Sequence, residues 1–149
     1  MVSRDSMSQN ERVAALLARE PVDRVPFVHK GYSFCAANVG FPKADIFEFP
    51  EKSYLAQQWT MEQYDAEVAP FYTFVAYGSW EFGCEIAWPE ERWSSGPSVS
   101  RRPVKEIADV YKLALPDVRT AGCLPRMIEF ARLQEAHGSQ IGFIYGSPF

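Results

Sequence analysis

Six side chains lie at or just after the ends of the three segments that look most like buried strands, and they are the residues best placed to bind a substrate. They are His29, Tyr32, Tyr72, Thr73, Tyr145 and Ser147. An imidazole exchanges protons near neutral pH, and hydroxyl groups donate and accept hydrogen bonds. If the strands are parallel, their carboxyl ends meet at one edge, where α/β barrels carry their active sites. We therefore take these six as substrate-binding candidates and assign no catalytic residue. The plainer alternatives are a loop role for His29 and strand packing for the others.

The chain has few side chains that could bind a metal ion. His29 and His137 are its only histidines, and Cys35, Cys84 and Cys123 are widely spaced without a C-x-x-C pair. Structural zinc sites use four ligands, usually in closely spaced pairs. An odd number of distant cysteines also gives no disulfide framework. We expect no metal site in this chain and three cysteines that pack as small apolar side chains.

Several enzyme classes are disfavoured because their motifs are missing. The chain contains no G-x-G-x-x-G, no Walker motif, no G-x-S-x-G and no H-E-x-x-H. These motifs bind dinucleotides, bind nucleotide phosphates, present a nucleophilic serine and hold a catalytic zinc, respectively. Glu81 and Glu85 are acid–base candidates, and we expect both to be solvated.

Charge and hydropathy indicate the cellular compartment and the kinds of partner to expect. Fifteen basic residues stand against nineteen acidic ones, a net charge of −4. No basic cluster suited to nucleic acid is present. The N-terminus lacks the apolar stretch of a signal peptide, and the most apolar segment, residues 68–77, is much shorter than the ~20 residues of a membrane helix. These features predict a cytoplasmic protein with neither a nucleic-acid nor a membrane partner.

Helical periodicity and strand-like segments alternate along the chain. The predicted helices cover residues 9–19, a segment that ends at Gly40, and residues 50–64, 104–111 and 125–137. The predicted buried strands cover residues 25–28, 67–74 and 141–145, with a short extra strand at 85–88 and a loop or hairpin at 89–102. Strands separated by helices favour a parallel sheet, because each crossover passes over one face.

The fold class predicted from this order is α/β, with about three parallel strands in one domain over residues 1–149. A complete (β/α)8 barrel needs about 250 residues. The last apolar segment is followed by no helix to cover it, although parallel strands are normally buried on both faces. We therefore expect an incomplete domain.

Several segments together resemble the uroporphyrinogen decarboxylase (URO-D) superfamily. Residues 11–16 read ERVAAL and residues 20–26 read EPVDRVP, similar to the helix and the first strand entry of that family. FGCEI at 82–86 and GPSV at 96–99 are similar to its middle, and GFIYGSPF at 142–149 to a later strand and its exit. The resemblance implies that residues 1–149 are the N-terminal half of a TIM-barrel domain.

Two departures separate the chain from the decarboxylases themselves. Members with that activity carry an RQAGR stretch after the first strand, whose arginines clamp substrate carboxylates, as a guanidinium fork can. Here residues 29–34 read HKGYSF, and no arginine lies between Arg24 and Arg92. The decarboxylases also carry Phe-Ser-Asp after the second strand, where the Asp meets the pyrrole nitrogens. The matching residues here are Tyr72, Thr73 and Phe74.

The corrinoid-dependent methyltransferase branch resembles the chain more closely in its EPVDRVP opening and its Gly-Cys-Glu-Ile segment. The resemblance implies methyl transfer between a corrinoid protein and a thiol. It also implies a zinc site formed by a His-x-Cys pair and a later Cys in the C-terminal half, so this chain alone would be inactive. Two alternatives stay open: a uroporphyrinogen decarboxylase, a lyase acting on a tetrapyrrole-like small molecule, and a truncated non-catalytic protein that binds a partner.

Overall fold

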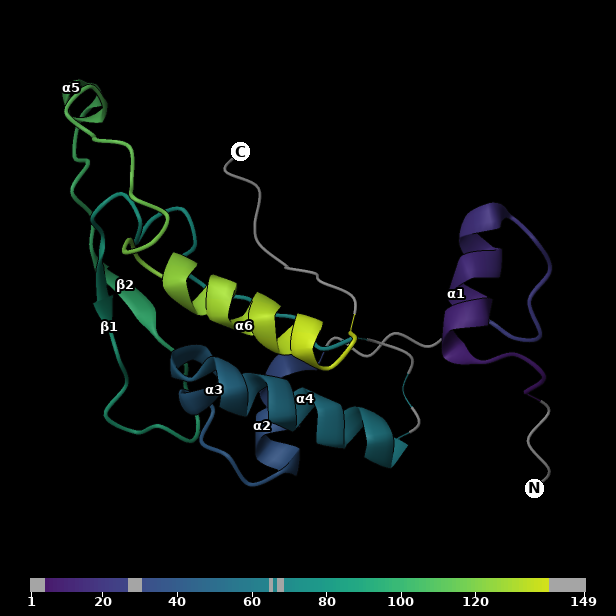
Figure 1. The fold of residues 1–149 in the computed structure, drawn as a ribbon. Coiled ribbons are helices and arrows are strands. Elements are labelled where there is room, and N and C mark those ends of the chain that lie inside the picture. Colours follow the sequence, from purple (N-terminus) through teal and green to yellow (C-terminus); the bar gives the residue numbers. More distant parts are fainter. Residues whose placement is uncertain (1–4, 27–30, 65, 67–68, 140–149) are drawn as a thin grey trace.

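The computed structural model describes residues 5–26, 31–64, 66 and 69–139. Six helices and two strands are found in these ranges (Figure 1). They are α1 (Gln9–Ala18), α2 (Tyr32–Asn38), α3 (Asp45–Glu48), α4 (Pro50–Tyr64), β1 (Glu85–Ala87), β2 (Ser98–Arg101), α5 (Ile107–Val110) and α6 (Leu124–Ala136). No helix in the described ranges is long and apolar enough to cross a membrane.

Helix α1 begins and ends as its sequence predicts. The Ser8 side chain accepts from the backbone N–H of Glu11, and the Glu11 carboxylate accepts from the backbone N–H of Ser8, which completes a capping box. The guanidinium of Arg12, on the helix, donates to the carboxylate of Asp23, in the segment after it, over 2.6 Å and 2.9 Å. Arg12 is buried, so this pair closes the segment after α1 back onto the helix.

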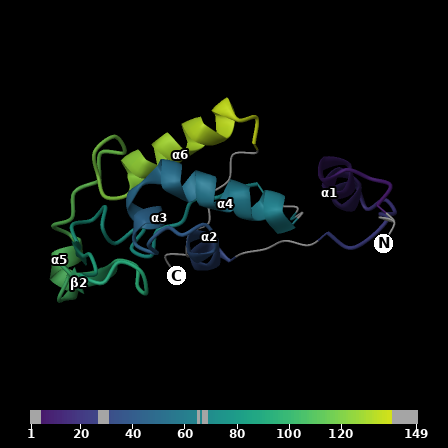
Figure 2. The same ribbon diagram turned by 90° about the horizontal axis from the view of Figure 1, so that it is seen from below.

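Helix α4 is the centre of the main body. It packs against α2, α3 and α6 (Figures 1 and 2). Its buried face includes Tyr54 and Ala56, which belong to one apolar cluster with Phe130 of α6 and Ile46 of α3. Both views place α1 away from this body, beyond the end of α4.

The described sheet is an antiparallel hairpin. β1 pairs with β2, with Ile86 opposite Val99, so the short extra strand and the hairpin predicted for residues 85–102 are confirmed. The three parallel strands are not seen in the described ranges. Residues 141–145, and parts of 25–28 and 67–74, lie outside them, and within residues 69–74 only Tyr72 forms a bridge, without a continuous strand. The parallel sheet therefore stays a prediction.

The helix predictions differ from the structure mainly in length. Helix α5 covers Ile107–Val110 instead of residues 104–111, and none of its residues is buried. Short helices are stabilised mainly by packing of an apolar face, and α5 buries none, so the helix does not extend to residues 104–111. Helix α6 ends as expected before Gly138, whose φ of 64° is in the left-handed region that glycine accepts without strain. Helix α3 was not predicted, because four residues give no readable periodicity.

Candidate functional site

Helix α3 is the point where side chains from three distant parts of the chain converge. The Tyr32 hydroxyl donates to the carbonyl oxygen of Ile46 over 2.8 Å. The Tyr72 hydroxyl donates to the carbonyl of Phe47 over 2.6 Å, and Arg126 Nε donates to that of Glu48 over 3.1 Å. Three successive carbonyls of this short helix, which it cannot pair internally, are thus satisfied from α2, from residues 69–74 and from α6.

The two tyrosines are buried and stay neutral. Burial raises the pKa of Tyr32 and of Tyr72 well above the ordinary value for a phenol. The Tyr32 hydroxyl also shares a hydrogen bond of 2.8 Å with Ser53 Oγ. A neutral phenol that already donates to a backbone carbonyl serves as a hydrogen-bond donor and is not a base at neutral pH. In the described part of the chain, these hydroxyls position α3.

Three of the six predicted substrate-binding residues are therefore neighbours. Tyr32, Tyr72 and Thr73 meet around α3: the Thr73 backbone lies beside the Tyr32 hydroxyl, and the Thr73 side chain is half-buried. His29, Tyr145 and Ser147 lie outside the described residues. Substrate binding by all six stays a prediction.

Replacing Tyr72 by phenylalanine should remove the donor to the Phe47 carbonyl and leave that carbonyl buried without it. We expect the free energy of unfolding to fall by about 1–3 kcal/mol. Urea denaturation measures the loss, and Tyr111→Phe is the control because Tyr111 is 86% exposed. A Tyr72→Phe variant as stable as the wild type would contradict a positioning role for this hydroxyl.

An ionic cluster on the other side of α3 was missed from the sequence. Asp45 accepts from Lys52 Nζ over 2.5 Å and from Arg92 over 2.6 Å and 3.0 Å. Arg92 also reaches Glu48 over 2.5 Å, and the Arg92 carbonyl accepts from Ala44 N–H. Arg92 is 47 residues from Asp45, so no local spacing could have shown the pair. The cluster holds the hairpin loop, residues 88–97, against α3.

Gly96 shows how closely that loop approaches the helix. A Cβ atom at position 96 would lie 2.8 Å from the Phe47 ring. Only glycine lets the backbone come so near without displacing the ring. The loop therefore covers Phe47, which is 4% exposed.

The charge of Asp45 is maintained by its partners. Burial disfavours the carboxylate, but hydrogen bonds from Lys52 and Arg92 outweigh this effect and hold the pKa of Asp45 below its ordinary value. A depressed folded-state pKa stabilises the fold above the unfolded-state value of about 3.9. That contribution is lost as the pH falls through the lower folded-state pKa.

We expect Asp45→Asn to loosen residues 88–97 at neutral pH, because the amide cannot balance two cations. Hydrogen exchange measured by mass spectrometry should show faster exchange in this loop and in α3. Glu85→Gln is the control, since Glu85 pairs with Arg101 in the same hairpin but both are exposed. Wild-type protein should keep its protection from pH 7 to pH 5. Equal loop protection in Asp45→Asn and wild type would rule out this role for Asp45.

Phe74, which the resemblance aligns with the aspartate of the decarboxylases, is enclosed by other rings. Its ring centroid is 5.1 Å from that of Trp80 and 6.1 Å from those of Phe47 and Trp88. Phe74 is 4% exposed. Such a cluster offers apolar contact and no charge to a bound group.

Glu81 is not the solvated acid that its sequence context predicted. Its carboxylate accepts from the backbone N–H of Gly78 over 2.7 Å and of Cys123 over 2.8 Å. It thereby joins the turn before β1 to the N-terminus of α6, where a negative charge suits the helix dipole. Glu85 is solvated as expected.

The cysteines and possible metal ligands are dispersed. Cys35, Cys84 and Cys123 are buried and free, and burial raises the pKa of the Cys123 thiol well above its ordinary value. Within residues 5–26, 31–64, 66 and 69–139, no three His, Cys, Asp or Glu side chains come together to hold a metal ion. This part of the chain does not fit a zinc ion.

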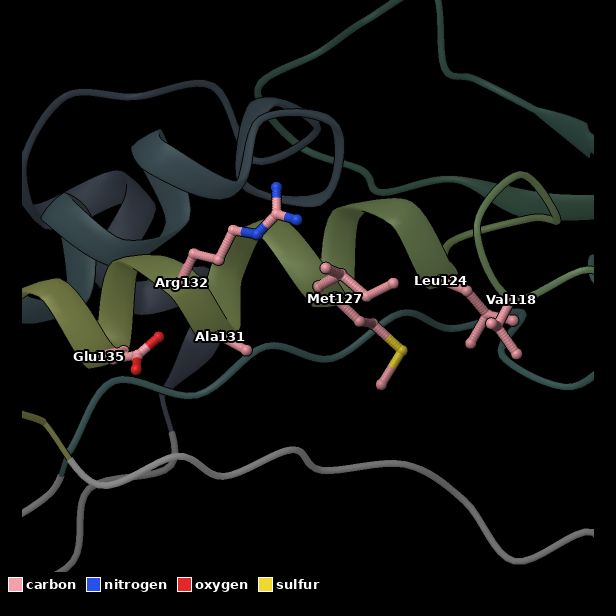
Figure 3. Close-up of a pocket in the computed structure, with 7 residues that line it drawn as sticks. Val118, Leu124, Met127, Ala131, Arg132 and Glu135 are labelled. Atoms are coloured by element: carbon pink, nitrogen blue, oxygen red, sulfur yellow. The ribbon is translucent and has the colours of Figure 1, made fainter.

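An apolar groove runs along the outer side of α6 (Figure 3). Its volume is about 370 Å³. Its lining residues are Val118, Leu124, Met127, Ile128, Ala131, Arg132 and Glu135. Tyr32 and Tyr72 do not line this groove. Its charged residues, Arg132 and Glu135, lie toward the C-terminal end of α6.

Known proteins resemble the chain over most of its length. The family model of uroporphyrinogen decarboxylase (URO-D) matches residues 8–149. Among solved structures, a methyltransferase from Methanosarcina mazei is similar over 95% of this chain, with a TM-score of 0.67 and 25% sequence identity. The chain spans 42% of the length of that methyltransferase. No curated protein matches the chain.

Proposed function

Because the chain belongs to the uroporphyrinogen decarboxylase family, we propose that it forms the N-terminal part of a (β/α)8 barrel enzyme that transfers a methyl group from a corrinoid protein to a thiol. The observation that carries the proposal is the likeness to a methyltransferase over 95% of the chain. Since the chain spans less than half of that protein, the remaining sequence would complete the barrel, and this part alone would be inactive.

Phe74 supports methyl transfer over decarboxylation. A decarboxylase needs a carboxylate near the pyrrole nitrogens, and the resemblance places that carboxylate at position 74. The ring of Phe74 is packed among Phe47, Trp80 and Trp88. An aromatic side chain neither accepts a hydrogen bond strongly nor balances a cationic pyrrole. Residues 29–34 also contain no arginine, so this stretch has no guanidinium group to pair with substrate carboxylates, which again argues against decarboxylation.

The proposed reaction exchanges one bond for another. The sulfur of a deprotonated thiol attacks the methyl carbon carried by the corrinoid protein, and a carbon–sulfur bond forms. The cobalt–carbon bond breaks, and its electron pair stays with the corrinoid as Co(I); the thiol proton leaves to solvent. The family's methyltransferases use zinc to make the thiolate, but the described residues of this chain do not fit zinc. We therefore assign the zinc ligands to sequence beyond this chain and no zinc-dependent step to its residues.

Two other functions remain as alternatives. A uroporphyrinogen decarboxylase is favoured by the family match itself. A non-catalytic protein that binds a partner would follow if the gene product contained only this chain.

The test uses the complete gene product. Methylcobalamin serves as the methyl donor probe and a small thiol as the acceptor, and the corrinoid absorbance spectrum reports loss of the methyl group. We expect thiol-dependent demethylation and formation of the methyl thioether. Parallel incubation with uroporphyrinogen should give no coproporphyrinogen. Decarboxylation without demethylation would replace the proposal with the first alternative.

A further inference from the structure

The hairpin loop, residues 88–97, lies over two aromatic rings of the main body. The ring of Trp88, at the start of the loop, has its centroid 6.1 Å from that of Phe74. Near the end of the loop, a Cβ atom on Gly96 would lie 2.8 Å from the ring of Phe47. Phe47 and Phe74 are each 4% exposed, and their centroids are 6.1 Å apart. These two rings, the ring pair, are therefore kept from solvent partly by the loop.

The loop and its hairpin have hydrogen bonds of their own. The Glu91 carboxylate accepts from the backbone N–H of Trp93 over 2.9 Å and of Ser94 over 2.8 Å, so the tip of the loop is a closed turn. At the base of the loop, β1 pairs with β2, and only Ile86 and Val99 of these strands are half-buried. The hairpin can therefore keep its internal bonds when its loop moves away from the main body.

One residue makes the polar contacts that hold the loop down. Among the described residues, the hydrogen bonds and ion pairs that join the loop to α3 and to Ala44 before it all involve Arg92. The Arg92 side chain is 36% exposed and that of its partner Glu48 is 32% exposed. Ion pairs with this much exposure are weak and are weakened further by salt.

We propose that residues 88–97 form a lid that opens as a unit and uncovers the ring pair. The closed position is held by the ion pairs of Arg92 and by the contacts of Trp88 and Gly96 with the two rings. Opening breaks few bonds, because the turn at Glu91 and the β1–β2 ladder stay intact. The opened lid exposes apolar ring faces that the closed lid withholds from any ligand.

Hydroxyl-radical footprinting of the complete gene product, read by mass spectrometry, tests the proposal. In wild-type protein, raising NaCl from 50 mM to 1 M should increase the oxidation rates of Phe47 and Phe74 by about three- to tenfold, since the Arg92 ion pairs weaken. Arg92→Gln should show the faster rates at both salt concentrations and no salt response. Arg101→Gln is the matched control, because Arg101 pairs with Glu85 on the exposed strands of the same hairpin, and it should behave as wild type.

A second variant opens the lid without removing a charge. In Gly96→Ala the new methyl group meets the Phe47 ring, so both rings should be oxidised faster even at 50 mM NaCl. Hydrogen exchange in α4 should stay at the wild-type rate in every variant, which separates lid opening from unfolding. Unchanged oxidation of the ring pair in wild type at 1 M NaCl and in both lid variants would overturn the proposal. Exposure of the rings only together with loss of protection in α4 would overturn it as well.

Discussion

Phe74→Asp should leave the protein largely unfolded at pH 7. Phe74 is 4% exposed and touches the rings of Phe47, Trp80 and Trp88. Truncating a buried phenylalanine costs about 3–5 kcal/mol, and an unpaired carboxylate in an apolar cluster adds a desolvation cost of several kcal/mol. The sum approaches the whole stability of a typical domain, about 5–15 kcal/mol. Circular dichroism and urea denaturation measure the loss.

The pH dependence of this variant identifies the cause. Burial would raise the folded-state pKa of the new carboxyl above the unfolded-state value of about 3.9, so between these two values the folded protein would hold a proton that the unfolded chain has already released. Stability of Phe74→Asp relative to wild type should therefore increase as the pH falls. Phe74→Leu is the control and should cost only about 1.5 kcal/mol, without a pH trend. If Phe74→Asp is as stable as Phe74→Leu at pH 7, position 74 can accept a carboxylate and the decarboxylase alternative gains support.

Phe130→Ala should produce the other large loss. Phe130 is fully buried on α6, and its ring lies 5.7 Å from that of Tyr54 on α4 and 5.4 Å from that of Tyr72. Through this ring α6 contacts both the central helix and the segment that holds α3. We expect a loss of about 3–5 kcal/mol in the free energy of unfolding, measured by urea denaturation at one fixed protein concentration.

Glu129→Ala provides the comparison on the same helix. Glu129 is adjacent to Phe130 but exposed, so its replacement should change stability by no more than about 0.5 kcal/mol. Similar losses in the two variants would mean that the helix and not its buried ring carries the effect, and the packing described for Phe130 would be incorrect.

The sequence predicted those elements whose signals are local. The capping box at Ser8 and Glu11 marked the start of α1, and Pro50 marked the start of α4. Gly138 marked the end of α6. Each of these signals acts within about one turn of helix, so it can be read without knowing what the helix packs against.

The candidate site depended on contacts that no local pattern records. Arg92 reaches Asp45 across 47 residues, and Arg126 reaches the Glu48 carbonyl across 78. Glu81 looked like a solvated acid because its two backbone partners come from separate turns. Tyr32 and Tyr72 were singled out as polar residues after apolar segments, and the structure does bring them together. Their hydroxyls, however, bind the backbone of α3, which the sequence did not show to be a helix.

The resemblance to a known family predicted more about the chain than the local patterns did. The segments EPVDRVP and GFIYGSPF lie at opposite ends of the chain, and the family model covers residues 8–149. Family membership therefore followed from the order of short motifs. The reaction did not, because the residues that separate methyl transfer from decarboxylation are few, and Phe74 is the one that the structure describes in full.

Methyl transfer is tested most directly by the reaction of the complete gene product with methylcobalamin and a thiol, beside an incubation with uroporphyrinogen. We expect thiol-dependent loss of the methyl group from the corrinoid, a methyl thioether as product and no coproporphyrinogen. Coproporphyrinogen without methyl transfer would identify a decarboxylase, despite the aromatic residue at position 74. A folded gene product with neither activity would identify a non-catalytic protein, and either result would contradict the proposed methyl transfer.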